Sequence, residues 1–338
     1  MAAAPGRDAR RRVAVLGQGS IGRRHAGLLR ELGCDVVVFD PLAAQVAEGV
    51  ERAASMDAAL ATAAAVVIAS PTSEHLDQIR AAIEHGCHTL VEKPLAVSLD
   101  NVDGTIALAR ERGLILAVAM NLRFHPGPRR LKEIVEAGQI GRPLTAHFTF
   151  GYHLPSWRPG TDYTRSYSAR SELGGGVLLD VIHEIDYATW LLGDISEVSG
   201  WVERISQLQV DVEDVALLHA RFASGALGSF SLDYLDRSYR RGAHIAGDLG
   251  SARWSWRDEV VEVFGGDGRV EAFPAPSAVD ESYRLEIAEF MSAVEAGSAD
   301  TGSTQLVDAR AGRGALAVVE AARRSAADRG CRVRVDAG

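Results

Sequence analysis

Residues 13–119 alternate short, continuous apolar runs with stretches whose apolar residues recur at helical spacing. The apolar runs are short enough to be strands, and they lie at residues 13–16, 35–39, 65–69, 88–91 and 114–119. In the intervening stretches the apolar residues are about 3.6 positions apart, the period of an α-helix. Buried strands that alternate with helices indicate a parallel sheet with helices on both faces. The first third of the chain is therefore predicted to be a doubly wound α/β domain.

The hydrophobic pattern changes after residue 121. A helix is expected around residues 128–137, and residues 144–152 then alternate apolar and polar side chains, the period of a strand with one buried face. Similar runs follow at residues 198–205, 215–222, 226–234 and 260–264, before helices at 282–296 and 306–323 and a short strand at 332–335. We expect two domains, residues 1–122 and residues 123–338, the second of them α+β with a mostly antiparallel sheet.

A glycine-rich loop follows the first predicted strand directly and leads into a helix. Gly17 would permit the tight turn, Gly19 would let a pyrophosphate approach the backbone, and Gly22 would let helix and strand pack closely. The first amides of the helix, including those of Ser20 and Ile21, would face the phosphates. The pattern in this context predicts a Rossmann domain that binds a dinucleotide.

Asp40 ends the second strand, 18 residues after Gly22 (40 minus 22). A carboxylate at this place can accept hydrogen bonds from both ribose hydroxyls of NAD, and it would repel the 2′-phosphate of NADP. We therefore expect NAD rather than NADP as the cofactor. Asp40 is equally suited to cap a helix after Pro41, and the two roles are compatible.

Lys93 follows the strand at residues 88–91, within the sequence Glu92-Lys93-Pro94, at the edge of the sheet where ligands of open parallel sheets bind. It is one of only two lysines, the other being Lys132, among 36 basic residues. A lysine can release a proton in a buried site, whereas an arginine cannot, and its ammonium can stabilise a developing alkoxide. Lys93 is therefore a candidate catalytic residue, although an isolated lysine is more commonly a solvated surface charge.

An acid and a histidine share one face of a helix predicted at residues 177–192. Asp180 and His183 are three positions apart, and Leu173-Gly-Gly-Gly precedes this helix, so that the backbone can be approached closely. With a reference pKa near 6.5, His183 suits the deprotonation of an alcohol at neutral pH. Either Asp180 or Asp186 could orient it. A metal held by His183 with Asp180 or Glu184 is an alternative, and we expect none.

Residues 151–170 combine aromatic rings with arginines. Trp157 and Tyr163 could stack on a sugar face, and Arg158 and Arg165 could bind a carboxylate or phosphate. The same composition also fits an ordinary surface loop.

Charge and cysteine content limit the remaining possibilities. The net charge is −9 with no basic block, which argues against a nucleic-acid surface. No apolar run is long enough to span a bilayer. The three cysteines are far apart and show neither metal spacing nor a disulfide framework, so we expect a protein of the reducing cytoplasm.

These motifs occur together in an order that resembles one known family. The glycine loop, Ser70-Pro71-Thr72, Glu92-Lys93-Pro94, the segment from Asn121 to Pro126 and the segment from Gly174 to His183 are similar to those of the Gfo/Idh/MocA family, the glucose–fructose oxidoreductase and inositol dehydrogenase group. The resemblance extends over residues 12–335. It implies a C-terminal domain with a large open sheet, which commonly makes the contacts of a homodimer or homotetramer.

The resemblance also implies site residues. Lys93, Asp180 and His183 would form the catalytic group, although the common pattern places the acid and the histidine four residues apart and not three. The expected cofactor contacts are Gly17, Gly19, Ser20, Ile21, Gly22, Asp40, Ser70, Pro71, Thr72, His75, Glu92, Lys93 and Asn121. The expected substrate contacts are Arg123, Trp157, Arg158, Tyr163, Arg165, Asp180 and His183.

The expected function is hydride transfer between NAD and a carbinol or keto carbon of a sugar, nucleotide sugar or cyclitol. Two alternatives come from the same resemblance. One is a regulator that senses a dinucleotide or sugar without turnover. The other is a net non-redox sugar enzyme, an epimerase or glycosidase, that uses tightly bound NAD.

Overall fold

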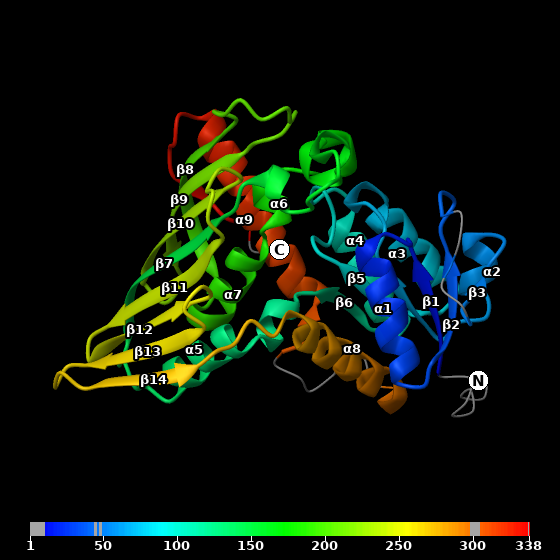
Figure 1. Cartoon of the computed structure of the whole chain (residues 1–338), viewed down its shortest axis with the longest axis horizontal. Helices are drawn as coiled ribbons and strands as arrows, with labels where there is room; N and C mark the ends of the chain where they lie inside the picture. Colours follow the sequence, from blue (N-terminus) through cyan, green and yellow to red (C-terminus); the bar gives the residue numbers. More distant parts are fainter. Residues whose placement is uncertain (1–10, 44–45, 47–48, 298–304, 337) are drawn as a thin grey trace. The chain divides into compact units, whose positions relative to one another are not determined.

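The computed structural model describes residues 11–43, 46, 49–297, 305–336 and 338. The chain folds into two compact units (Figure 1). Unit 1 comprises Met1–Asn121 and Asp280–Arg313, and unit 2 comprises Leu122–Val279 and Gly314–Gly338. This division differs from the predicted domains, because a C-terminal segment returns to unit 1. That segment contains most of helix α8, whose apolar residues are buried against strands of unit 1, and a sequence pattern does not reveal which sheet a helix will cover.

Unit 1 is built on a seven-stranded sheet, counted over the described residues, in the order β15-β6-β5-β4-β1-β2-β3. All its strands pair in parallel except β15, which pairs antiparallel with β6. The strands are β1 (Arg12–Leu16), β2 (Asp35–Phe39), β3 (Glu51–Arg52), β4 (Ala65–Ile68), β5 (His88–Glu92), β6 (Leu116–Ala119) and β15 (Val307–Asp308). The helices are α1 (Ser20–Glu31), α2 (Met56–Leu60), α3 (His75–Glu84), α4 (Val102–Glu111) and α8 (Val279–Ala296).

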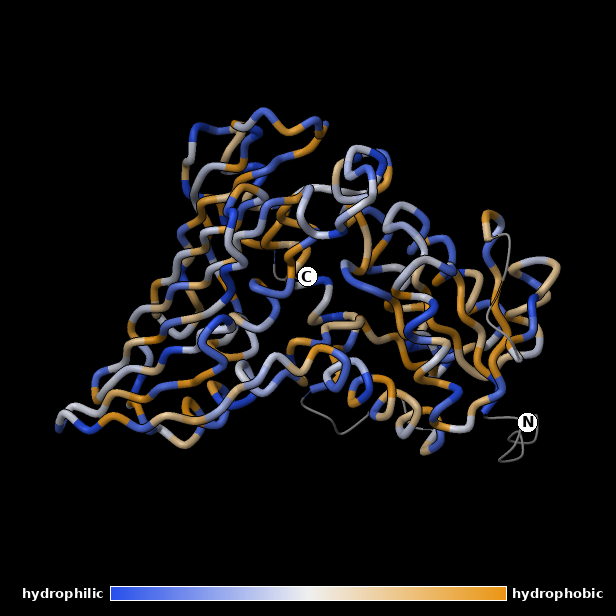
Figure 2. Tube along the Cα trace, in the orientation of Figure 1, coloured by the Kyte–Doolittle hydropathy of each residue, from blue (hydrophilic) through white to orange (hydrophobic). Residues whose placement is uncertain are grey.

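The core of unit 1 explains why these strands read as unbroken apolar runs. Helices α1 and α8 contribute Leu29 and Phe290 to a buried cluster that also holds Val13 and Val67 from the central strands. Helix α3 packs against β4 and β5. Figure 2 shows continuous hydrophobic colour along these central strands. A sheet covered on both faces has no polar side, and the carboxyl ends of its parallel strands meet at one edge.

Unit 2 contains nine strands, among the residues described, in the order β14-β13-β12-β11-β7-β10-β9-β8-β16. All neighbours pair antiparallel except β7 and β10, which are parallel. The strands are β7 (Pro143–Gly151), β8 (Ile195–Glu203), β9 (Val215–Phe222), β10 (Leu227–Asp233), β11 (Arg240–Gly247), β12 (Gly250–Ser255), β13 (Val260–Gly265), β14 (Val270–Pro274) and β16 (Val333–Arg334). The helices are α5 (Pro126–Glu136), α6 (Val177–Asp180), α7 (His183–Leu192) and α9 (Ala309–Ala327), the last of which starts in unit 1.

Helices cover one face of the unit 2 sheet. Helix α5 packs on β12 and β13, α6 on β9 and β10, and α7 on β7. Figure 1 shows these helices on the same side of the sheet. On β9, Leu217 and His219 are exposed, whereas Leu218 between them is buried. This alternation of burial is the period of two that predicted the strand.

The structure and the predicted fold agree in class: a Rossmann-type parallel sheet is followed by a large, mostly antiparallel one. The sequence patterns did not predict β11, β12 or β14. Gly242 in β11 and Gly250 in β12 interrupt the alternation; a Cβ atom on either would meet a carbonyl oxygen of the neighbouring strand, at 2.4 Å from Trp254 O and 2.5 Å from Phe264 O respectively. None of the helices in the described part of the chain combines the length and hydropathy needed to cross a membrane.

Candidate active site

The glycine loop has the shape that a bound dinucleotide requires. Gly17 has a φ of +92°, and a Cβ atom there would lie 2.6 Å from Ala69 O. A Cβ on Gly22 would lie 1.9 Å from Gly17 O, so this close packing admits no side chain. A Cβ on Gly19 would meet no atom within 4 Å, which leaves open space in front of the backbone at the start of α1. The first-turn amides of a helix lack intrahelical acceptors, so this space suits a pyrophosphate.

Asp40 ties the loop after β2 to the glycine loop. Its Oδ2 accepts the backbone N–H of Gln18 at 2.7 Å, and its Oδ1 accepts the N–H groups of Leu42 at 2.7 Å and Ala43 at 3.1 Å. Asp40 thus binds the backbone N–H groups that follow it, as the predicted capping role requires, but these groups belong to a turn and not to a helix. Oδ2 accepts only one of these bonds, so its second lone pair leaves room for a ribose hydroxyl.

Two loops meet at the carboxyl edge of β4 and β5. Ser70 follows β4, and Lys93 and Pro94 follow β5. His75, only 1% exposed, joins them, with Nδ1 2.8 Å from Pro94 O and Nε2 3.1 Å from Ser70 O. Burial lowers the pKa of His75, although both carbonyls favour its charged form. Because its polar atoms face the backbone, we assign His75 to holding these loops and not to the predicted direct cofactor contact.

Two further predicted site residues, Asn121 and Arg123, make side-chain hydrogen bonds within the protein. The Asn121 side chain, 5% exposed, donates to Ser282 Oγ at 2.8 Å. Arg123, 7% exposed, donates to both oxygens of Asp186, at 2.9 and 2.7 Å, and its guanidinium carbon lies 5.5 Å from the centroid of the Trp190 ring. The structure therefore places Arg123 in a buried ion pair with α7, and its predicted substrate contact stays a prediction. The arginine was attributed to the substrate because its sequence position carries no sign of its partner.

The predicted single helix at residues 177–192 is two helices. Helix α6 ends at Asp180 and α7 begins at His183, because Val181 leaves the helical region with φ −110° and ψ 33°. The expectation that the acid and the histidine share one helix face through regular spacing is therefore wrong. The break places Asp180 at the end of one short helix and His183 at the start of the next.

Two tyrosines hold Asp180, which is 5% exposed. Tyr167 donates its hydroxyl to Oδ1, and Tyr234 donates its hydroxyl to Oδ2 at 2.8 Å. Tyr234 is fully buried, and burial together with the neighbouring carboxylate raises its pKa well above the usual value. Tyr234 therefore remains a hydrogen-bond donor to Asp180 at any physiological pH. Neither tyrosine could be assigned to this site from sequence spacing, since Tyr234 lies 54 residues away.

Both acids beside His183 on α7 belong to buried ion pairs. Asp186 is held by Arg123, and Glu184 lies 2.7 Å from Arg241 Nε. His183 itself is 7% exposed. Both oxygens of Asp186 accept from Arg123, so Asp186 anchors α7 to the segment before α5. In the described residues no group of three or more His, Cys, Asp or Glu side chains is arranged to hold a metal ion.

Aromatic rings of residues 151–170 pack next to Tyr234, one of the two tyrosines that bind Asp180. Trp157 meets the Tyr234 ring edge-on at 5.3 Å and stacks with Tyr152 at 6.5 Å, between ring centroids. The Arg158 guanidinium carbon lies 5.9 Å from the Tyr167 ring centroid. Trp157 and Arg158 are thus next to the two tyrosines that bind Asp180. By contrast, Tyr163 accepts the backbone N–H of Gln209 at 3.1 Å, and Arg165 is exposed.

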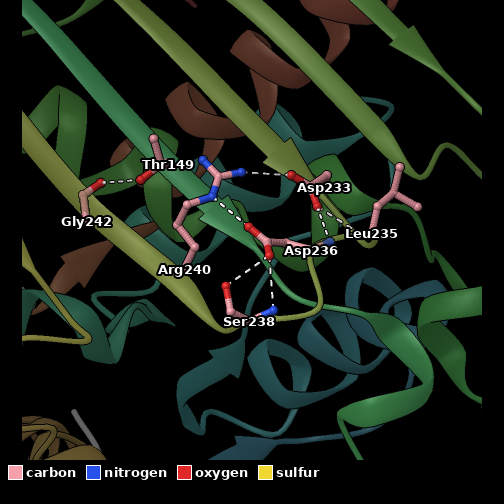
Figure 3. Close-up of polar contacts among 7 residues, drawn as sticks. All are labelled: Thr149, Asp233, Leu235, Asp236, Ser238, Arg240 and Gly242. Carbon is pink, nitrogen blue, oxygen red and sulfur yellow. Dashed lines mark hydrogen bonds and ion pairs between the residues drawn. The ribbon is translucent and has the colours of Figure 1, made fainter.

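Polar contacts fix the connection that follows Tyr234 (Figure 3). Arg240 donates to Asp233 and to Asp236, each at 3.0 Å. Asp236 also accepts the N–H and the hydroxyl of Ser238, and Asp233 accepts the N–H of Leu235 at 2.9 Å. These bonds join the end of β10 to the start of β11. They therefore fix the backbone directly before Tyr234, at Asp233, and directly after it, at Leu235 and Asp236.

The glycines before α6 are required by the protein's own packing. A Cβ on Gly175 would lie 2.3 Å from Tyr167 O, and a Cβ on Gly176, where φ is +112°, would lie 2.5 Å from Glu213 Oε1. The segment that approaches the glycine backbone closely is therefore the one around Tyr167. This close approach brings the backbone of Tyr167 against the start of the helix that ends in Asp180.

Two family models match the chain. Residues 11–120 match the oxidoreductase family with an NAD-binding Rossmann fold, and residues 129–253 match the GFO/IDH/MocA C-terminal domain. The N-terminal part of unit 1 is thus an NAD-binding Rossmann domain. This agrees with the glycine-loop geometry and confirms the prediction made from the glycine pattern between a strand and a helix.

Curated relatives and solved structures are also similar. The chain is 32% identical over 278 residues to the myo-inositol 2-dehydrogenase of Thermotoga maritima, a match that covers 77% of this chain and 75% of that relative. It is 30% identical over 189 residues to the 1,5-anhydro-D-fructose reductase of Ensifer adhaerens; the match covers 55% of this chain and spans only about half, 55%, of that relative. A levoglucosan dehydrogenase structure in complex with NADH has the same fold, with a TM-score of 0.83 and 23% identity over 96% of this chain and 99% of that one.

Proposed function

Because this chain belongs to the Gfo/Idh/MocA family of oxidoreductases, we propose that it transfers a hydride between NAD and a carbinol or keto carbon of a sugar, nucleotide sugar or cyclitol. The observation that carries the proposal is a shared edge of the unit 1 sheet. The glycine loop follows β1, and Lys93 follows β5, at the carboxyl ends of parallel strands separated only by β4. Ligands of open α/β sheets bind at this edge.

Each proposed catalytic residue has a role in moving charge. Bound NAD accepts or supplies the hydride at C4 of its nicotinamide ring. In the oxidative direction His183 accepts the proton of the sugar hydroxyl, while the Lys93 ammonium stabilises negative charge on the same oxygen. Reduction reverses these steps, so that His183 returns its proton to the new hydroxyl. The proton and the hydride together account for the two hydrogens lost from the carbinol.

The surroundings of Asp180 support a sugar-type substrate. Its carboxylate, together with Tyr167, presents acceptors and donors of the kind that sugar hydroxyls need. Trp157 offers an aromatic ring beside them, and aromatic rings stack on the apolar faces of sugars. Arg158, held near Tyr167, would meet an anionic group such as that of a nucleotide sugar. We therefore assign Asp180, Tyr167, Trp157 and Arg158 to substrate binding.

A panel assay tests this function. The purified protein is incubated with NAD and, separately, with myo-inositol, levoglucosan, 1,5-anhydro-D-glucitol and UDP-N-acetylglucosamine, and NADH formation is followed by absorbance. The reverse assays use the corresponding ketones with NADH. We expect saturable turnover with at least one member of the panel in one direction. Binding of NAD without net NADH change for any member would contradict the proposal, and it would favour a dinucleotide sensor or a net non-redox enzyme.

A further inference from the structure

His25 makes a buried contact that the proposed reaction does not yet use. It lies on α1, is fully buried, and places Nε2 2.8 Å from Oε1 of Glu92, 67 residues away at the end of β5. Its second nitrogen, Nδ1, is buried and has no hydrogen-bond partner within the described residues. Tyr283 packs edge-on against the ring with centroids 5.7 Å apart. The imidazole is therefore directed at Glu92 alone.

Glu92 transmits this contact to the residue that follows it. Its other oxygen, Oε2, accepts the backbone N–H of Lys93 at 3.1 Å. On the far side of Lys93, the carbonyl of Pro94 faces His75 Nδ1 at 2.8 Å. The backbone is thus bonded both before and after Lys93, and each of these bonds leads to a buried histidine. Glu92 thus links α1 to the backbone of Lys93. A fixed backbone at Lys93 fixes the direction in which the Lys93 side chain leaves the end of β5.

The charge of Glu92 makes the histidine necessary. Burial opposes its ionisation, but the hydrogen bond and charge of His25, with the charge and N–H of Lys93, outweigh burial, and the pKa of the Glu92 carboxyl lies below its usual value. An ionised carboxylate only accepts hydrogen bonds, so Nε2 of His25 carries the proton that is donated to Glu92. Removing the imidazole would leave a buried carboxylate with one oxygen uncompensated.

We propose that His25 is a positioning residue for Lys93, and that it acts through Glu92. Helix α1 begins at the glycine loop, and Gly22 lies one turn before His25 on the same helix face. The helix that presents its N-terminus to the cofactor therefore also fixes the segment that carries Lys93. The catalytic part of this inference rests on the proposed function, whereas the coupling of His25 to the Lys93 backbone does not.

Three variants separate positioning from general stability. His25→Gln retains an N–H donor at a reach similar to that of Nε2, and His25→Leu removes the donor while keeping an apolar side chain. Leu29→Val is the matched control, because Leu29 is fully buried one turn further along α1 and has no polar contact with Glu92. This control trims the same helix face and so reports on packing alone.

The chain offers a direct spectroscopic probe, since it has only two lysines. Protein labelled with ¹⁵N-lysine gives two backbone amide signals, and Lys132→Arg assigns them. We expect His25→Leu to shift the Lys93 amide signal, His25→Gln to shift it less, and Leu29→Val to leave it in place, while the Lys132 signal stays constant. An unmoved Lys93 signal in His25→Leu, or an equal shift in Leu29→Val, would overturn the proposal.

Steady-state kinetics complete the test on whichever substrate is active. In His25→Leu we expect kcat to fall about tenfold, a barrier change of about 1.4 kcal/mol, with the KM for NAD little changed and with partial rescue in His25→Gln. A fall of the same size in Leu29→Val would contradict a positioning role. Failure of the proposed function looks different: no member of the panel would then give a net NADH change, even though His25→Leu still moved the Lys93 amide signal.

Discussion

At the scale of single residues, several polar groups of the candidate site make hydrogen bonds within the protein itself. Asp40 is the clearest case, because it closes a turn and also contacts the glycine loop through the N–H of Gln18. A substitution that removes the whole carboxylate therefore changes two things at once. An isosteric amide removes the charge and retains the hydrogen bonds of the turn.

Asp40 is expected to set the preference for NAD over NADP. In Asp40→Asn the amide oxygen can still accept the turn hydrogen bonds of Leu42 and Ala43, whereas the NH2 group cannot accept the N–H of Gln18. The repulsion of a 2′-phosphate disappears. We expect the ratio of NADP to NAD dissociation constants to narrow by about tenfold, or about 1.4 kcal/mol. Asp40→Ala should narrow the ratio as well, but with weaker binding of both cofactors because the turn is lost.

Calorimetric titration of wild type and both variants with each cofactor measures these ratios. Equal or tighter binding of NADP than of NAD by the wild type would remove Asp40 from this role.

Residues whose function depends on backbone shape were predictable, and residues that depend on a distant partner were not. Gly17, Gly19 and Gly22 follow from a local pattern, since each solves a local problem of space. Arg123 was assigned to substrate, whereas its partner Asp186 is 63 residues away and is brought to it only by folding. Tyr234 and His25 were missed for the same reason, because single tyrosines and histidines in a sequence are usually unremarkable core or surface residues.

At the scale of elements, a histidine caps the helix that follows β6. His125 Nδ1 accepts the N–H of Gly127 at 3.1 Å at the start of α5, and the ring stacks on Trp256 with centroids 4.5 Å apart. Burial, with a contribution from Arg241, lowers the pKa of His125 to about 4. Protonation would also put a hydrogen on Nδ1, where the Gly127 N–H already points. The cap therefore requires the neutral ring.

This cap should make the fold sensitive to acid. The unfolded state binds the proton near pH 6.5 and the folded state only near pH 4, so stability falls as pH decreases through this window, by up to about 3 kcal/mol. His125→Asn keeps a good capping oxygen and does not titrate. We expect it to be less stable than wild type at neutral pH, but to lose less stability towards low pH.

Urea unfolding at a series of pH values from about 7.5 to about 4.5 measures the difference, since carboxylates titrate alike in both proteins. Parallel loss of stability in wild type and His125→Asn would show that His125 does not account for the acid sensitivity.

The elements themselves were predictable to the extent that burial was periodic. The central strands of unit 1 were recognised because both faces are buried, and β9 was recognised because its faces alternate. Strands β11 and β12 were missed because their glycines, packed against neighbouring carbonyls, break the alternation. The prediction of a single helix at residues 177–192 was wrong at Val181, where the helix breaks. The hydrophobic pattern did not reveal the break, because apolar side chains are buried on both sides of it.

At the scale of the whole molecule, the unit 2 sheet leaves apolar side chains on the face without helices. Trp201 and Leu217 are 56% and 45% exposed and lie opposite each other on β8 and β9. Leu227 on β10 is 47% exposed. Antiparallel sheets can have one solvated face, but large apolar side chains that adjoin on that face, as Trp201 and Leu217 do, indicate an interaction surface. We propose that a second copy of the chain covers it, in a homodimer or homotetramer.

Light scattering coupled to size exclusion tests this assembly. Wild type should have two or four times the chain mass at micromolar concentration, and Leu217→Asp should shift it towards the monomer, because a charge would be buried in the interface. Leu249→Asp is the control: Leu249 is 64% exposed in the turn between β11 and β12. A monomeric wild type, or an equal effect of the control, would contradict the predicted interface.

Domain organisation was predictable only in part at this scale. The change of hydrophobic period after residue 121 marks where the first sheet ends, since each sheet has its own pattern of burial. The return of residues 280–313 to unit 1 could not be inferred, because α8 has an apolar face that would suit either sheet.

The most direct test of the account is the turnover of Lys93→Arg against that of Lys132→Arg, the same substitution at the only other lysine. Lys132 lies on α5, donates to Trp190 O at 2.7 Å and pairs with Glu136, so arginine can replace it. With the active sugar and saturating NAD, we predict that Lys93→Arg lowers kcat by about 10²-fold or more with NAD affinity retained, since the planar guanidinium cannot take the place of the compact ammonium at the substrate oxygen. Lys132→Arg should turn over like the wild type. Turnover of Lys93→Arg at the wild-type rate would contradict the catalytic assignment and leave the chain as a dinucleotide-binding protein with its chemistry elsewhere.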